Sequence, residues 1–314
     1  MEYRRLGRAG LEVSAVGIGC NNFGGRMDPG ATRAVVDAAI DHGVTLFDTA
    51  DVYGNQASER LLGQALGDRR SRVVVATKFG MPMGASPLQR GGSRRYIFQA
   101  AEASLRRLGT DYIDLYQMHA PDAETPIQET LAALDDLVRS GKVRYIGCSN
   151  FAGWQIADAA WIARDARLTP FVSAQNHYSL LERNVEREVV PACERFGLGI
   201  LPYFPLASGM LTGKYKRAEP PPTGTRLANA GAMAQRALSE RNFDAVEKLS
   251  AFAADHGKTI LDAALGWLLA KPALASVIAG ATSPAQVEAN VHAAEAWRMS
   301  RDEVARADEI TKRR

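Results

Sequence analysis

The chain has 314 residues, is 46% hydrophobic and has a formal net charge of +3 with acidic and basic residues interspersed, which excludes an extended nucleic-acid-binding patch. Cys20, Cys148 and Cys193 are too few and too far apart for a disulfide framework or a CxxC motif. No signal-like apolar core or membrane-length run of roughly 18 residues is present. We therefore expect a soluble cytoplasmic protein without nucleic-acid or membrane partners.

The first predicted element is a β-hairpin, because polar and apolar residues alternate on both sides of residues 7–10. Eight short apolar runs follow, with amphipathic helical stretches between them. In chain order these runs are AVGIG, VTLFD, VVVATK, IDLYQM, VRYIGCS, FVSAQ, GILPYF and SVIAG. Strands that are apolar on both faces and are separated by helices indicate parallel pairing through βαβ crossovers.

Eight β/α units favour a (β/α)8 TIM barrel, an α/β fold, over an open doubly wound sheet. A dinucleotide-binding sheet would need G-x-G-x-x-G after its first strand, whereas residues 17–22 read GIGCNN. Thr125 and Pro126 predict a capping box with proline at the first helical position, and Ser283 and Pro284 predict another helix start. No linker divides the chain, so a single domain over residues 1–314 is predicted.

The longest interruption of the β/α pattern follows the seventh strand, from residue 205 to about residue 241. It contains AEPPPTGTR and is rich in proline and glycine. Its composition fits a lid or cofactor clasp, and it fits an irregular excursion equally well.

Polar side chains close the predicted strands, and an α/β barrel forms its active site at these carboxyl ends. Asp48 ends the second strand with Tyr53 just beyond, Lys78 ends the third and His119 ends the fourth. The next three strands are predicted to end at Ser149-Asn150, Gln175-Asn176 and Tyr203. Each residue alone has an ordinary explanation as a cap, a packed ring or a snorkelling ammonium. Together they are hard to explain as packing, because burial of polar groups is costly unless they pair.

The chemistry of this set points to proton transfer by a tyrosine. A phenol titrates near pH 10, and a neighbouring ammonium favours the phenolate and lowers that pKa. We expect Lys78 to act on Tyr53 in this way, Asp48 to keep the ammonium charged, and His119 to donate a second hydrogen bond. The sequence has no metal-ligand spacing and no serine in a nucleophile elbow, so a hydride would have to come from a bound cofactor.

These residues lie in motifs that resemble the aldo-keto reductase family over nearly the whole chain. The motifs are LGRAGLEVSAVGIGCNNFGG, FDTADVYG, VVVATKFG, DLYQMH, GKVRYIGCSNF, AQNHYSLLER, LPYFPLASGMLTGKY and VIAGATSPAQVEAN. The resemblance implies the barrel fold and NADP(H)-linked reduction of a small aldehyde or ketone, with a catalytic tetrad of Asp48, Tyr53, Lys78 and His119.

The resemblance also implies the positions that hold the cofactor. The nicotinamide is expected at Ser149, Asn150, Gln175 and Tyr203. The pyrophosphate and adenosine phosphate are expected at Leu206, Gly209, Lys214 and Arg226. The adenine end is expected at Gly280, Thr282, Gln286 and Asn290, and further cofactor contacts are expected at Gly19, Cys20, Asn21 and Pro205.

The chain departs from the family pattern at the adenine end and in the last strand. Thr282 stands where many relatives have arginine, Ala289 where an acidic residue is common, and Ala279 where proline is common. NADPH preference is therefore expected to rest mainly on Arg226. Gln286 has an alternative role as the third residue of a capping box. The potassium-channel β-subunits share the superfamily and the tetrad, so a nucleotide-sensing regulatory barrel is the alternative to an enzyme.

Overall fold

A hairpin of β1 (Tyr3–Arg5) and β2 (Glu12–Ser14) begins the computed structural model, which describes residues 1–228 and 230–312. The predicted domain also includes residues 229, 313 and 314, which lie outside the described residues. Leu6 and Val13 of the hairpin are fully buried in a cluster with side chains from the barrel interior. The hairpin also hydrogen-bonds to Thr45, which directly precedes a barrel strand. It therefore closes the end of the barrel at which the strands begin.

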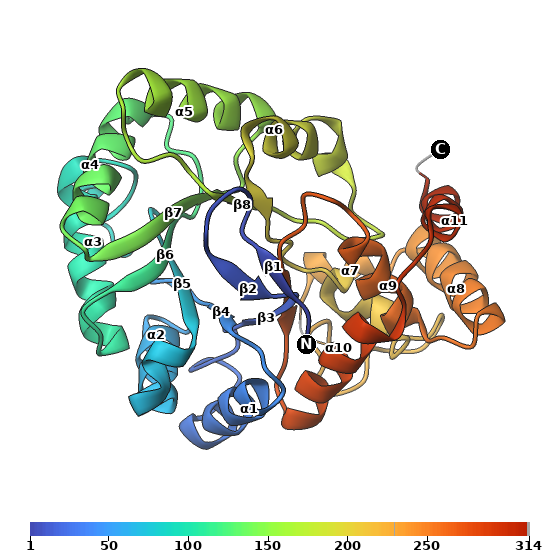
Figure 1. Cartoon of the computed structure of the whole chain (residues 1–314). Helices are drawn as coiled ribbons and strands as arrows, with labels where there is room; N and C mark the ends of the chain where they lie inside the picture. The colour runs from blue at the N-terminus through green and yellow to red at the C-terminus, as the bar shows by residue number, and fades with distance from the viewer. Residues whose placement is uncertain (229, 313–314) are drawn as a thin grey trace.

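Eight parallel strands form the barrel wall, as the alternation of apolar runs predicts (Figure 1). They are β3 (Val16–Gly19), β4 (Leu46–Asp48), β5 (Val74–Phe79), β6 (Ile113–Met118), β7 (Val143–Ser149), β8 (Ser173–Gln175), β9 (Gly199–Ile200) and β10 (Val277–Gly280). Adjacent strands pair in the order β10-β3-β4-β5-β6-β7-β8-β9. The N–H of Ile278 donates to the carbonyl of Pro202 at 3.1 Å, which links β10 back to the chain after β9.

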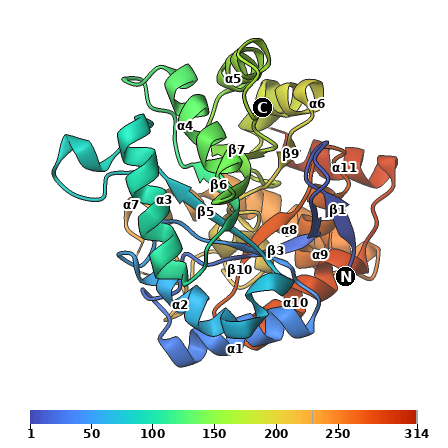
Figure 2. The ribbon, with the colours of Figure 1, turned by 60° about the vertical axis from the view of Figure 1, so that its left-hand side comes forward.

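The helices lie outside the strands in both views of the ribbon (Figures 1 and 2). Those in the β/α units are α1 (Pro29–Asp41), α2 (Ala57–Leu66), α3 (Arg94–Leu108), α4 (Ile127–Arg139), α5 (Gly153–Asp165), α6 (Val189–Phe196), α9 (Ile260–Leu269) and α10 (Pro284–Ala296). The helices α7 (Ala232–Ala237), α8 (Glu240–Asp255) and α11 (Arg301–Thr311) are additional. Helix α10 packs beside α1, which closes the ring. No described helix is long and apolar enough to cross a membrane.

Two local predictions at element ends differ from the structure. Helix α4 begins at Ile127, with Pro126 outside it as the N-cap and no side-chain cap. The predicted capping box is wrong because the hydroxyl of Thr125 donates to Asp122 at 2.7 Å instead. The seventh barrel strand, predicted to end at Tyr203, ends as a regular strand at Ile200, and Tyr203 continues the pairing as an isolated parallel bridge to His177, with its N–H donating to the carbonyl of Asn176 at 3.1 Å.

Other helix starts follow the sequence signals. Ser283 caps α10 by accepting a hydrogen bond from the backbone N–H of Gln286, with Pro284 in the first turn as predicted. Asp28 caps α1 in the same way. These caps satisfy N–H groups that have no partner within their own helix. They fix where the helices start after β3 and β10, on either side of the cavity described next.

Candidate active site

A cavity of about 660 Å³ lies at the carboxyl ends of the barrel strands. Its walls include the last residues of β3, β4, β7, β8 and β10, namely Gly19, Asp48, Ser149, Gln175 and Gly280. All the predicted site residues line this cavity except Lys78 and Cys20, which are both fully buried. The fold therefore brings together residues that are spread over most of the chain.

A buried ion pair joins Lys78 to Asp48 at one end of the cavity. The Nζ atom of Lys78 donates to Asp48 Oδ2 at 2.7 Å and to the carbonyl of Thr49 at 2.8 Å. Lys78 is 0% exposed and Asp48 is 3% exposed. Burial alone would lower the pKa of Lys78, but the attraction of Asp48 and Tyr53 raises it above its ordinary value. The lysine is therefore charged at neutral pH.

Gln117 is a residue of this end of the cavity that the sequence analysis missed. Asp48 Oδ1 accepts hydrogen bonds from Gln175 Nε2 at 2.8 Å and from Gln117 Nε2 at 3.3 Å. Gln117 is fully buried and pairs with Lys78 in the β5–β6 register. The available signal was a single amide inside the otherwise apolar run IDLYQM. Both glutamines fix the orientation of the carboxylate that holds Lys78.

Tyr53 lies next to the ammonium, but its pKa shifts in the direction opposite to the prediction. Its hydroxyl is 3.5 Å from Lys78 Nζ, and its ring centroid is 5.0 Å from that atom. Burial raises the pKa of Tyr53 above its ordinary value of 10.0, and the charge of Lys78 only partly offsets this. The negative charge of Asp48, which is paired with this ammonium, adds to the rise and opposes the effect of Lys78 on the phenol. Tyr53 therefore holds its proton at neutral pH.

His119 is the second hydrogen-bonding group beside Tyr53. The two rings meet edge to face, with centroids 5.7 Å apart. Burial, with a smaller contribution from Lys78, lowers the pKa of His119 from 6.5 to about 3, so the imidazole is neutral. Its Nδ1 atom is buried and makes no hydrogen bond to the residues that the structure describes. A neutral imidazole still has one N–H to donate, as the predicted role requires.

Asn150 connects His119 to the aromatic wall of the cavity. Its Nδ2 donates to the carbonyl of His119 at 2.9 Å, and its Oδ1 accepts from the hydroxyl of Tyr203 at 2.8 Å. The Tyr203 ring stacks on His177, with centroids 5.4 Å apart and an interplanar angle of 17°. These contacts hold one face of Tyr203 and fix the orientation of its ring in the cavity wall.

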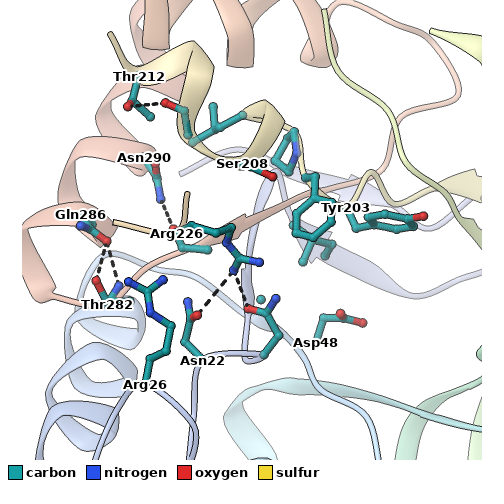
Figure 3. Close-up of a pocket in the computed structure, with 18 of the residues that line it drawn as sticks. Asn22, Arg26, Asp48, Tyr203, Ser208, Thr212, Arg226, Thr282, Gln286 and Asn290 are labelled. Carbon is teal, nitrogen blue, oxygen red and sulfur yellow. Dashed lines mark hydrogen bonds between the residues drawn. The ribbon is translucent and has the colours of Figure 1, made fainter. Parts of the chain in front are cut away.

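Three basic side chains, Arg26, Lys214 and Arg226, line the other end of the cavity. Figure 3 shows the two arginines, of which Arg26 was missed by the sequence analysis. Arg226 Nη2 donates to Asn21 Oδ1 at 3.3 Å, and its guanidinium is 5.1 Å from the ring of Phe204. Arg26 donates to the carbonyl of Gly224 and so joins the β3–α1 loop to the segment after β9. The sequence signal was a basic residue in the glycine-rich stretch FGGR.

The two guanidiniums lie close enough to affect each other. Burial lowers the pKa of Arg226, and the charge of Arg26 lowers it further. Neither side chain forms an ion pair with a carboxylate within residues 1–228 and 230–312. Two cations that share a cavity wall without a counter-charge favour the binding of an anion.

The third cation, Lys214, reaches the cavity across a glycine. Gly209 has a positive φ of 97°, which favours glycine. A Cβ atom at this position would lie 2.7 Å from Lys214 Cε. A glycine at position 209 therefore permits both the turn and the close approach of the lysine.

Gln286 does not complete the capping box that was the alternative to its expected cofactor contact. Its Oε1 accepts from the backbone N–H of Thr282 at 2.8 Å and from the Thr282 hydroxyl at 3.2 Å. Asn290 Nδ2 donates weakly to the carbonyl of Gly280 at 3.5 Å. Helix α10 and the end of β10 are thus tied together where they border the cavity (Figure 3).

Comparison with known proteins agrees with this geometry. Residues 15–312 match the model of the Aldo/keto reductase family. The chain belongs to the aldo/keto reductase family. It is 40% identical over 307 residues to the "Uncharacterized oxidoreductase YrpG" of Bacillus subtilis, which covers 94% of this chain and 91% of that protein. The family and these oxidoreductase relatives support an oxidoreductase with a nicotinamide cofactor.

Two further relatives differ from each other in their described roles. A "Probable voltage-gated potassium channel subunit beta" of Arabidopsis thaliana is 37% identical over 299 residues, 93% of this chain and 91% of that protein. The "L-glyceraldehyde 3-phosphate reductase" of Escherichia coli K12 is 33% identical over 321 residues, 98% of this chain and 92% of that protein. The relatives of this chain therefore carry names of both enzymes and channel subunits.

The cavity of this aldo/keto reductase fits a nicotinamide dinucleotide. It extends from the Tyr53 and His119 end to the end lined by Arg26, Lys214 and Arg226. A dinucleotide needs an aromatic or apolar contact for its nicotinamide and positive charge for its phosphates. Tyr203 supplies the first and the three cations supply the second. Among the described residues, no group of three or more His, Cys, Asp and Glu side chains is placed to hold a metal.

The buried ion pair predicts a large effect of Lys78→Met on stability. The variant keeps an apolar stem but leaves Asp48 buried without a counter-charge, so we expect a loss of about 3–5 kcal/mol in the free energy of unfolding. Urea denaturation measures this loss. In the double variant Lys78→Met/Asp48→Asn the buried charge is gone, and more than half of the stability should return. A double variant no more stable than Lys78→Met would show that lost packing, not the unpaired carboxylate, is responsible.

The lowered pKa of His119 predicts a dependence of stability on acid. The folded state favours the neutral ring, so its contribution is full above pH 6.5 and is lost as the pH falls from 6.5 towards about 3. His119→Gln removes this titration. Denaturant unfolding between about pH 7 and about pH 4 should show the wild-type protein losing more stability than the variant. Parallel loss in the two proteins would contradict the buried neutral imidazole.

Proposed function

We propose that this chain is an NADP(H)-dependent oxidoreductase that reduces a small aldehyde or ketone to an alcohol, with Tyr53 as the general acid. The main support is one arrangement within a single cavity. A protonated phenol and a neutral imidazole lie at one end, above the Lys78–Asp48 pair, and guanidiniums without counter-charges lie at the other end. Family membership adds the nicotinamide cofactor.

Each residue at the Tyr53 end of the cavity has a separate role in the proposed reduction. A reduced nicotinamide, when bound, supplies the hydride for the carbonyl carbon. Tyr53 donates its proton to the carbonyl oxygen, where negative charge develops, and His119 donates a hydrogen bond to the same oxygen. The ammonium of Lys78, 3.5 Å from the phenol oxygen, stabilises the phenolate that remains. Asp48 keeps the ammonium charged throughout.

The protonation state of Tyr53 suits the direction of carbonyl reduction. A general acid must hold its proton when the substrate binds, and burial keeps Tyr53 protonated at neutral pH. Lys78 does not lower the pKa of the resting phenol below its ordinary value. Lys78 instead stabilises the phenolate that Tyr53 becomes after it donates its proton, because an ammonium stabilises a buried phenolate far more than a neutral phenol.

The cations at the far end of the cavity support NADPH over NADH. A 2′-phosphate needs cationic and preferably bidentate recognition, which guanidiniums provide. The sequence analysis expected this preference to rest mainly on Arg226. Arg26 adds a second guanidinium that points into the same part of the cavity as Thr282 (Figure 3). We therefore attribute the preference to both arginines.

A second candidate function is nucleotide sensing in a regulatory subunit. It is favoured by the 37% identity to the potassium channel subunit beta of Arabidopsis thaliana. Both candidates bind the same cofactor, but they differ in turnover. Steady-state NADPH oxidation with a panel of carbonyl compounds, including L-glyceraldehyde 3-phosphate because of the relative from Escherichia coli, separates them. Multiple turnovers support the enzyme, and cofactor binding without turnover on any carbonyl supports the regulatory candidate.

The role of Tyr53 predicts a specific defect in Tyr53→Phe. The change removes the transferable proton and keeps the ring, so the rate of carbonyl reduction should fall by about 100-fold or more. The dissociation constant for NADPH should stay within about twofold, because the hydroxyl is not part of the cation end of the cavity. Stopped-flow reduction and fluorescence titration measure the two quantities. Near-normal reduction by the Phe variant would remove Tyr53 as the acid.

The two arginines predict a change in cofactor preference. Arg226→Ala and Arg26→Gln should each weaken NADPH binding by about 10-fold to 100-fold, the range for a lost hydrogen bond to a charged group. NADH binding should barely change, because NADH lacks the 2′-phosphate. Fluorescence titration with both cofactors is the measurement, and Arg33→Ala, an exposed arginine outside the cavity, is the matched control. Equal weakening for both cofactors would place the arginines on the pyrophosphate or the adenine instead.

A further inference from the structure

Asp51 is a buried carboxyl that the proposed reaction does not use. It lies between Asp48 and Tyr53 in the segment after β4 and is 1% exposed. Neither of its carboxyl oxygens has a hydrogen-bond partner among the residues that the structure describes. A buried ionised carboxylate without donors is unfavourable, so such a group requires an explanation.

The charged neighbours of Asp51 do not compensate it. Helix α2 contributes Glu59, a fully buried carboxylate that repels a second negative charge. Helix α3 contributes Arg107, but Arg107 Nε is already bound to Glu59 Oε2 at 2.6 Å. Lys78 of β5 is engaged by Asp48. Burial first and Glu59 second therefore raise the pKa of Asp51 from 3.8 to about 7, and Arg107, the nearby N–H of Val52 and Lys78 offset this only in part.

Two phenols complete the surroundings of Asp51. Tyr96 of α3 and Tyr116 of β6 are both buried, and in each the hydroxyl has no hydrogen-bond partner within the described chain. Burial raises the pKa of both phenols, and Asp51 raises it further. They therefore stay protonated at any pH at which Asp51 titrates. Asp51, Tyr96 and Tyr116 are thus a cluster of buried polar groups that influence one another, in which the carboxyl is the group that changes charge near neutral pH.

The backbone couples this cluster to the catalytic groups. The N–H of Asp51 donates to the carbonyl of Lys78 at 3.3 Å, and the N–H of Tyr53 donates to the carbonyl of Ala50 at 3.2 Å. The same short segment, residues 48–53, thus includes Asp48, Asp51 and Tyr53. The contact between the Tyr53 hydroxyl and Lys78 Nζ is already long at 3.5 Å, so a small shift of the segment breaks it.

We propose that Asp51 is a positioning residue that holds residues 48–53 in the catalytic geometry while its carboxyl is neutral. When the carboxyl ionises, it is drawn towards water or towards Arg107 because it lacks donors and is repelled by Glu59. The segment then shifts, and the Tyr53 hydroxyl moves away from Lys78. This inference rests on the proposed role of Tyr53 as the acid, and Asp51 itself touches neither substrate nor cofactor.

The pH dependence of Asp51→Asn tests the proposal. The amide has nearly the same shape and cannot ionise. In the wild-type protein, kcat for carbonyl reduction should fall by up to about tenfold per pH unit above about 7, and in the variant it should stay level to about pH 9. His119 and Tyr53 do not titrate in this range. The KM values and the dissociation constant for NADPH should not change in either protein.

Matched variants separate the cluster from general effects of charge. Asp68→Asn removes an exposed aspartate and should keep the wild-type profile. The Tyr116 hydroxyl makes no hydrogen bond to the carboxyl, but it is a polar group near it, so Tyr116→Phe makes the surroundings of the ionised form less polar and the fall in kcat should move to higher pH. Tyr112→Phe, whose ring packs against Arg70 and Arg144, is the control phenol and should not move it. A wild-type profile in Asp51→Asn would overturn the proposal.

Infrared spectroscopy provides a readout that does not depend on turnover. The C=O band of a protonated carboxyl should be present near pH 6 in the wild-type protein, disappear as the pH rises through about 7, and be absent from Asp51→Asn. The folded state favours the protonated group, so the wild-type protein should lose stability relative to Asp51→Asn as the pH rises from 3.8 through about 7. Absence of this band overturns the proposal. Its presence without any carbonyl reduction rejects the proposed function instead.

Discussion

The buried contact between Lys78 and Asp48 organises the catalytic end of the barrel. An ammonium and a carboxylate that are both removed from water are stable only when each has the other and further hydrogen bonds. Thr49 completes the coordination of the lysine, and Gln175 and Gln117 complete that of the carboxylate. These five residues come from β4, β5, β6 and β8 and the segment after β4, so the ion pair fixes the relative positions of four strands at their carboxyl ends.

The two ends of the cavity, one of which lies beside this ion pair, differ in their electrostatics. At the Tyr53 end burial disfavours the charged forms, so Tyr53 and His119 are both neutral and both able to donate. At the other end Arg26 and Arg226 remain without a carboxylate partner among the described residues, which favours a phosphate-bearing ligand. The distance between the two ends is set by the barrel, because the last residues of the strands form the walls between them. A long dinucleotide suits such a site better than a compact ligand.

Three of the described non-glycine residues with a positive φ line the cavity. Asn150, Phe204 and Ser208 line it and have φ values of 62°, 51° and 59°, in the left-handed region that side chains rarely adopt. Such conformations cost free energy and persist where surrounding contacts enforce them. Here the contacts are Asn150 with His119 and Tyr203, and Phe204 with Arg226 and the His177–Tyr203 stack. The contacts that hold these backbone conformations therefore also hold the aromatic and basic side chains that a bound cofactor would contact.

The sequence by itself determined the barrel and brought Asp48, Tyr53, Lys78 and His119 to one end of it, because apolar runs fix the strands and a polar residue at the end of a parallel strand must lie near the rim. It did not determine the contacts that depend on distant neighbours. In the sequence, Gln117 is one residue of an apolar run and Arg26 is one residue of a loop. In the structure, Gln117 of β6 donates to Asp48, and Arg26 donates to the carbonyl of Gly224, 198 positions later. The sequence also predicted a lowered pKa for Tyr53, whereas the structure raises it, because burial and the nearby charge of Asp48 are properties of the folded surroundings. Pattern and spacing specify which side chains reach the rim, and only tertiary packing decides their solvation and the charges that surround them.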